Sequence, residues 1–285
     1  MKKKKMGILA LIALTGAMAF CSIPQNALAN ELEAAAKGTK ENPIIIGDGG
    51  DLQTLSETAK DTYYYVKKGG TIESLAKYSY VTKVEYGGKI EHAYYGSRVE
   101  NLQGLVQSAY NGSTISYVHD NGVVNYVNTG AIVEDVYASG TITTVNGGEV
   151  GTVYHGGTVK NVINNGMVSQ VEGGVVENVS SGGNVGVVWF SSLVKNVNAG
   201  GKVTLVSAGY VTNVNNLGYV KDLDGGGVIS NINDGGRVST VNFGFIENLY
   251  KGATIEDLTE GGKVINQQKG STIIINNGVI ANIID

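Results

Sequence analysis

One nine-residue phrase recurs along the chain from Gly69 onward. It consists of two glycines, a variable residue, an apolar residue, two polar residues and a second apolar residue, as in GGTVKNV at residues 156–162 and GGRVSTV at residues 235–241. An apolar pair at positions i and i+3 would also suit one face of a helix, but repeated paired glycines and abundant valine make a helix costly. The pattern therefore predicts short β-strands joined by glycine turns.

Asparagine marks every second phrase at the position just before the second apolar residue, at intervals of 16 to 18 residues. These residues are Asn161, Asn178, Asn196, Asn213, Asn231, Asn248, Asn266 and Asn282. Such short strands bury nothing alone, so they must stack as a solenoid. We expect two phrases to form one rung of about 17.5 residues, with about twelve rungs after residue 70 and the asparagines stacked as an amide ladder. The alternative, a three-phrase rung of about 27 residues, would scramble that ladder.

A different pattern precedes the repeats. Residues 43–46 and 63–66 read as strands, and residues 51–59 read as a short helix with Asp51 as its N-cap and Leu52 and Leu55 on one face. The predicted fold is therefore all-β, a β-solenoid (β-helix) with a small N-terminal α/β cap that covers the edge of the first rung. The expected organisation is a signal peptide at 1–29, a leader and cap at 30–69, and the solenoid repeat domain at 70–285.

The first 29 residues resemble an export signal. A basic stretch at residues 2–5 precedes an apolar stretch at residues 6–20 and a small-residue cleavage site at residues 27–29, so the mature chain is expected to start at Asn30. The apolar stretch is too short for a membrane span. Lipidation at Cys21 is the alternative, but the bulky residue before it does not fit a lipobox. We expect an exported protein, extracellular or on the bacterial cell surface.

Composition narrows the function. The chain has 42 glycines among 285 residues, and removing the four leader lysines leaves 17 basic against 25 acidic side chains. No basic face remains for nucleic acid. The expected mature chain has no cysteine and no membrane span, so hydrogen bonding and packing must stabilise it outside the cell.

The paired phrases resemble the passenger repeats of autotransporter adhesins of the AIDA type, over residues 70–285. That resemblance implies a surface-displayed β-helix that acts in adhesion, autoaggregation or biofilm formation. The chain departs from the family because no ten-residue alternating membrane strands of a translocator barrel follow the repeats.

Catalytic and metal-binding signals are weak. Asp222 and Asp224 are the best carboxylate pair, but they read as solvated turn residues, and His92, His119 and His155 occupy different positions in the phrase. The nine-residue Gly-Gly period is also typical of calcium-binding RTX rolls, whose turn carboxylates are missing here. We assign no catalytic, cofactor or metal residue and expect a non-enzymatic protein. A β-helix polysaccharide-active enzyme, a lyase or hydrolase, is the alternative.

Contact surfaces are the remaining expectation. Tyrosine is concentrated early, with 13 of 16 between Tyr63 and Tyr154, which suits either stacked aromatic ladders or a carbohydrate-binding strip. Trp189, Phe190 and Phe243 are expected to point outward as a contact patch. The repeat persists to Asp285, so self-association through an uncapped C-terminal rung is expected, beside a surface glycan or protein receptor.

Overall fold

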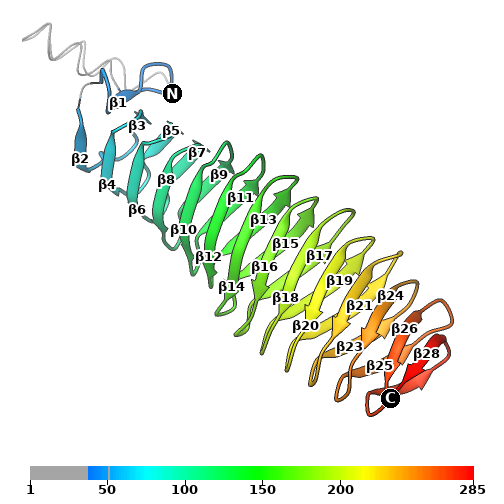
Figure 1. The fold of residues 1–285 in the computed structure, drawn as a ribbon. Helices are drawn as coiled ribbons and strands as arrows, with labels where there is room; N and C mark the ends of the chain where they lie inside the picture. The colour runs from blue at the N-terminus through cyan, green and yellow to red at the C-terminus, as the bar shows by residue number, and fades with distance from the viewer. Residues whose placement is uncertain (1–37, 51) are drawn as a thin grey trace, which may run out of the picture. The chain divides into compact units, whose positions relative to one another are not determined.

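A computed structural model describes residues 38–50 and 52–285 of this chain, which wind into a parallel β-solenoid (Figure 1). The predicted signal peptide and most of the leader lie outside the described residues. Successive strands alternate between two sheets of 14 strands each, and every pair of neighbouring strands within a sheet is parallel. One rung therefore takes one strand from each sheet. The two-phrase rung is confirmed, and the three-phrase alternative is wrong.

We call the sheet that starts with β1 sheet A and the sheet that starts with β2 sheet B. Sheet A contains β1 (Ile44–Ile46), β3 (Tyr63–Val66), β5 (Tyr80–Val84), β7 (Arg98–Leu102), β9 (Thr114–Val118), β11 (Ile132–Val136), β13 (Glu149–Tyr154), β15 (Met167–Glu172), β17 (Asn184–Val188), β19 (Lys202–Ser207), β21 (Tyr219–Asp224), β23 (Arg237–Val241), β25 (Thr254–Leu258) and β27 (Thr272–Asn276). Sheet B contains β2 (Thr54–Glu57), β4 (Thr71–Leu75), β6 (Lys89–Ala93), β8 (Leu105–Ala109), β10 (Val123–Asn128), β12 (Thr141–Asn146), β14 (Thr158–Ile163), β16 (Val175–Val179), β18 (Leu193–Val197), β20 (Tyr210–Val214), β22 (Val228–Ile232), β24 (Phe245–Leu249), β26 (Lys263–Gln268) and β28 (Val279–Ile284).

The two apolar residues of each phrase form the core. In β14 and β16, Val159 pairs with Val176 and Val162 with Val179, and all four side chains are fully buried. The same two columns stay closed from Ile72 to Val264. A strand that buries two residues cannot be stable alone, so the interior is shared between neighbouring rungs.

Glycines before the strands allow the rungs to approach each other. A Cβ on Gly122 would lie 2.1 Å from the carbonyl oxygen of Leu102, and one on Gly218 would lie 2.1 Å from that of Val197. Each of these oxygens belongs to the previous rung, so there is no room for any other residue at these two positions. The glycine directly before the strand thus marks a close backbone approach, even where the residue before it is not glycine.

The predicted helix at residues 51–59 is wrong. Within its described part, Thr54–Glu57 form strand β2, in which Leu55 pairs with Ile72 of β4. Leu55 therefore occupies the first apolar position of a degenerate repeat phrase, and buried Thr58 takes the second, with its hydroxyl 2.8 Å from that of Ser79. Leu52, expected on the same helix face as Leu55, lies before β2 and is 44% exposed, so the two leucines share no buried face. The strands expected around residues 43–46 and 63–66 are observed as β1 and β3.

Turn length accounts for the alternating period. In the ladder half, each turn from sheet B to sheet A has four residues, as between Val179 and Asn184. Turns from sheet A to sheet B alternate instead, with three residues between Val171 and Val175 and four between Val188 and Leu193. Asparagine spacings of 17 and 18 follow from this alternation, because only one edge of the solenoid changes length.

Candidate functional site

The eight predicted asparagines form one column on the outside of sheet B. From Asn178 onward, each side-chain nitrogen donates to the oxygen of the asparagine one rung earlier, at 3.2 Å between Asn178 and Asn161 and at 3.0 Å between Asn282 and Asn266. The intervening pairs bond at 3.0 to 3.1 Å. The amides thus bind along the solenoid axis, and their role is to hold the rungs in register.

A second amide column, which the sequence reading missed, lies one position after the inner residue of sheet B. Asn215 donates to Asn198 and Asn233 donates to Asn215, both at 2.7 Å. In an earlier segment Asn146 donates to Asn128 at the same position, and Asn164, one residue further along its turn, donates to Asn146. The same period of 17 or 18 residues was present in the sequence, so the signal could have been found by reading every outer slot.

Trp189, Phe190 and Phe243 do not form one contiguous patch. The rings of Trp189 and Phe190 stack with centroids 6.3 Å apart, beside a hollow of about 380 Å³ above the short turn at Gly173. Phe243 occupies the same turn column three strands further along sheet A, and Ala208 and Gly225 lie between. All three side chains are at least partly exposed. The three residues therefore form two separate exposed aromatic sites along the turns from sheet A to sheet B.

The early rungs carry a denser aromatic cluster at the turns from sheet B to sheet A. The rings of Tyr94 and Tyr110 stack with centroids 5.3 Å apart, and Tyr78 meets Tyr95 edge to face at 6.1 Å. The Lys77 ammonium lies 4.9 Å from the centroid of the Tyr95 ring, a cation–π geometry. These rings contact one another, as expected for stacked aromatics, and a carbohydrate-binding strip stays a prediction.

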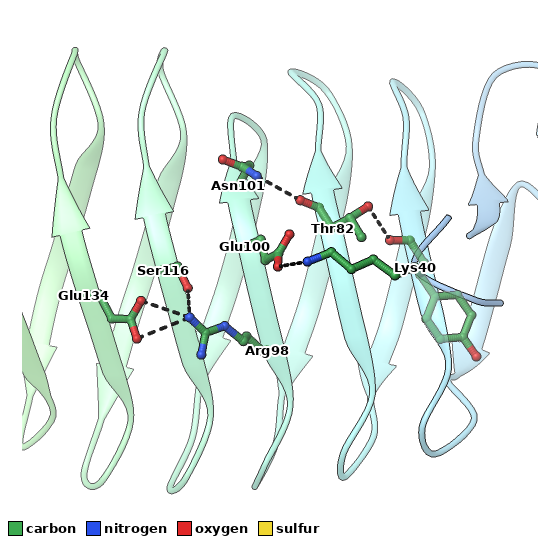
Figure 2. A network of polar contacts seen from close by, with 8 residues as sticks. Lys40, Thr82, Arg98, Glu100, Asn101, Ser116 and Glu134 are labelled. Carbon is green, nitrogen blue, oxygen red and sulfur yellow. Dashed lines mark hydrogen bonds and ion pairs between the residues drawn. The ribbon is translucent and has the colours of Figure 1, made fainter. Parts of the chain in front are cut away.

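Polar side chains on the outside of sheet A connect β5, β7, β9 and β11 (Figure 2). The Arg98 guanidinium donates to Ser116 at 2.8 Å and to Glu134 at 3.2 Å, and Lys40 pairs with Glu100 at 3.2 Å. Both ion pairs are largely solvent-exposed, so each contributes at most about 1 kcal/mol. The network joins rungs of sheet A and pairs both Glu100 and Glu134 with cations.

Three ionisable side chains near this network have shifted pKa values: Asp135, Tyr137 and Asp120. Burial, and then the neighbouring Glu134 carboxylate, raise the pKa of Asp135. Burial also raises the pKa of Tyr137, whose ring stacks on His119 with centroids 5.4 Å apart. Next to them, hydrogen bonds from His119 and then Gln103 hold the pKa of Asp120 below its usual value. Asp135 lies in β11, whereas Asp120 and Tyr137 lie in the turns that follow β9 and β11.

The weighed catalytic candidates have structural partners. The Asp222 carboxylate lies 2.9 Å from the Lys221 ammonium, and Asp224 accepts a hydrogen bond of 2.7 Å from the backbone N–H of Gly225. His92 lies in β6, whereas His119 and His155 lie in turns from sheet A to sheet B. Within residues 38–50 and 52–285, no group of three histidine, cysteine, aspartate or glutamate side chains is placed to hold a metal ion. The same part of the chain contains no helix capable of crossing a membrane.

Comparisons with known proteins do not identify a family for this chain. No protein-family model matches the chain, and no curated protein matches it. Among solved structures, the chain is similar to a hyper-glycosylated TibA fragment whose modification is catalysed by TibC, with 19% sequence identity and a TM-score of 0.39. That match covers 84% of this chain and 94% of the fragment. At such a low identity and TM-score, the likeness does not bear on the function of this chain.

Proposed function

We propose that this chain is a non-enzymatic, adhesin-like repeat protein that mediates cell contact, aggregation or matrix assembly. The observation that carries the proposal is a set of large aromatic side chains that project from a regular scaffold. Tyr86 and Phe190 are each 71% exposed and Phe243 is 63% exposed. Exposed aromatic side chains are typical of binding surfaces, where they supply large contact areas at low entropic cost.

The scaffold suits that role because contacts on the inner and outer faces of its sheets hold the rungs in register. Inner valines and isoleucines are closed to solvent, and the amide ladders tie the outer face of sheet B from Asn161 to Asn282. A rigid surface loses little conformational entropy when it binds. The repeats' resemblance to AIDA-type passengers supports the same proposal, including an extracellular or cell-surface location.

Aggregation is proposed to use the strands at the C-terminal edge of the described sheets. Ile274 of β27 and Ile283 of β28 are 65% and 75% exposed, and no described strand pairs with the outer edges of β27 and β28. Such an edge accepts a further strand, which we propose comes from a second copy of the chain. Size-exclusion chromatography with light scattering should show concentration-dependent oligomers that the double variant Ile280→Lys, Ile283→Lys loses. A monomer at every concentration would rule this out.

Purified chain immobilised on beads tests the adhesin proposal. We expect the beads to bind cells or to aggregate, and we expect a triple variant with Tyr86, Phe190 and Phe243 changed to Ser to bind far less while keeping its β-sheet circular dichroism. A matched variant with Ser139, Ser181 and Ser191 changed to Ala controls for exposed turn substitutions. Beads that neither bind cells nor aggregate would refute the proposal.

The competing function is a β-helix enzyme acting on polysaccharides. One observation favours it: Asp135, with its raised pKa, lies on a strand beside Tyr117, its register partner on β9. A carboxyl group with a raised pKa can serve as a general acid. Chain incubated with neutral and acidic polysaccharides should release no reducing ends or unsaturated products. Turnover that Asp135→Asn or Asp222→Asn abolishes would favour the enzyme instead.

A further inference from the structure

We propose that a notch beside Tyr86 binds a neutral saccharide. The notch arises from unequal turns at the edge where the chain passes from sheet A to sheet B. Only two residues, Gln103 and Gly104, separate Leu102 from Leu105, whereas the turns before and after contain four residues each. The missing length opens a hollow of about 400 Å³ between two longer turns, within the usual size of small-molecule clefts.

The walls of this Tyr86 notch differ in chemistry. Tyr86 stands in the preceding turn with 71% of its surface exposed, and Asn121 stands in the following turn. Gly104 and the side chain of Leu105 contribute to the lining between them. A Cβ at Gly104 would lie 2.4 Å from the carbonyl oxygen of Gly88, so no side chain can fill the notch from that position. The result is an open aromatic wall beside an apolar floor.

Of the residues that line the notch, only Lys89 carries a charged side chain. The Gln103 amide donates to Asp120 at 2.9 Å, and the same carboxylate lies 2.9 Å from the His119 ring nitrogen Nδ1, which holds the second wall in place. The Lys89 ammonium pairs with Glu91 at 2.5 Å. Among the described residues, the Asn121 side chain makes no hydrogen bond, so its amide is available as both donor and acceptor.

These features select the ligand class. A pyranose ring presents an apolar C–H face that stacks on an aromatic ring, and hydroxyl groups at its rim that exchange hydrogen bonds with amides. A phosphate or an acidic sugar would need an unpaired cation, but the notch has a paired lysine and a neighbouring aspartate. An apolar peptide would leave the amides unpaired. The assignment deepens the adhesin proposal and rests on it, because it names the receptor as a glycan.

Calorimetry and saturation-transfer NMR on the full chain test the assignment with four probes: cellotetraose, maltotetraose, chitotetraose and tetragalacturonate. At least one neutral tetrasaccharide should bind, and Tyr86→Ala should weaken it by about tenfold or more. Tyr86→Phe should keep the affinity within about twofold, since the ring face remains. Asn121→Gly, which preserves the left-handed backbone, should weaken binding by a few fold.

Tyr210→Ala is the control, because Tyr210 is an exposed tyrosine outside the notch, at 50% against 71% for Tyr86, and its loss should leave the affinity unchanged. The proposal is overturned if no neutral probe binds at about 10 mM, if binding survives Tyr86→Ala, or if only tetragalacturonate binds. The bead assay separates the two proposals. Cell binding without saccharide binding would refute the notch proposal and leave the adhesin proposal standing. Saccharide binding at Tyr86 without cell binding would refute the adhesin proposal and leave the notch proposal standing.

Discussion

The two halves of the solenoid share one interior and differ in one outer column of sheet B. In the later half that column is asparagine from Asn161 onward. In the earlier half the same register positions are Ser74, His92, Ser108, Tyr126 and Thr144. The inner residues are fully buried in both halves, so the amide ladder is not needed to wind the chain.

The buried residues are therefore enough to specify the solenoid. The outer column of sheet B instead determines the bonds between rungs and the side chains that the surface presents. Uniform asparagines bond each rung to the next and present one repetitive face. Mixed residues give up those bonds, and the earlier half has ring stacking, such as Tyr94 on Tyr110, and the Tyr86 notch. The continuous amide ladder thus lies in the later half, whereas the tyrosine cluster and the Tyr86 notch lie in the earlier half.

The largest expected loss of stability comes from glycine substitutions, which should affect both halves equally. Gly122→Ala in the early half and Gly218→Ala in the late half should each destabilise the chain by about 3 kcal/mol or more, because the new Cβ would overlap a carbonyl oxygen of the previous rung. Hydrogen exchange around the substituted rung measures the loss, with Ser181→Ala in an exposed turn as control. A large loss in only one half would contradict a shared interior.

A ladder substitution should separate the halves. Asn213→Ala leaves the oxygen of Asn196 without its donor and the nitrogen of Asn231 without its acceptor, which should cost about 1–3 kcal/mol. Thr144→Ala, at the equivalent position of the earlier half, should cost about 0.5 kcal/mol or less. Denaturant unfolding monitored by circular dichroism compares them, and equal losses would mean that the amide bonds add nothing.

The comparison can be sharpened by extending the ladder. Thr144 pairs with Asn161, whose nitrogen now donates to the carbonyl oxygen of Thr143 at 3.2 Å. Thr144→Asn should add one amide bond and stabilise the chain by about 0.5–1 kcal/mol. Thr212→Asn, adjacent to the ladder column, serves as the control. A neutral or destabilising result would show that the ladder cannot grow into the earlier half.

The smallest expected effect concerns pH. Burial, with the Glu85 carboxylate that accepts the Tyr65 hydroxyl hydrogen bond, raises the pKa of Tyr65 from 10.0 to about 12. The folded state therefore favours the neutral phenol, so this stabilisation is complete below pH 10 and is lost between pH 10 and about 12. Urea midpoints of the unsubstituted chain and Tyr65→Phe should converge over that range. A constant difference would exclude this linkage.

The sequence allowed the rung and the first ladder to be predicted because both depend on periodic residues. The prediction failed at Leu52 and Leu55, whose i, i+3 spacing fits a helix face as well as a repeat phrase. The structure instead places Leu55 at the first apolar position of β2 and leaves Leu52 44% exposed. The notch was not predictable, because Gln103 and Gly104 look like an irregularity until stacking places a short turn between two long ones. Residue spacing shows the period of the repeat, whereas this cavity depends on the difference in length between turns that become neighbours only after the rungs stack.

The turns from sheet A to sheet B have an evolutionary consequence. Two, three and four residues are all accepted at this edge, as between Asn276 and Val279, Val171 and Val175, and Val188 and Leu193, while the strands on either side keep their pairing. A single-codon insertion or deletion there shifts no buried side chain to the outside. The lineage can therefore remodel its surface relief by changing length at one edge, a route that is closed to sheets whose register depends on every residue.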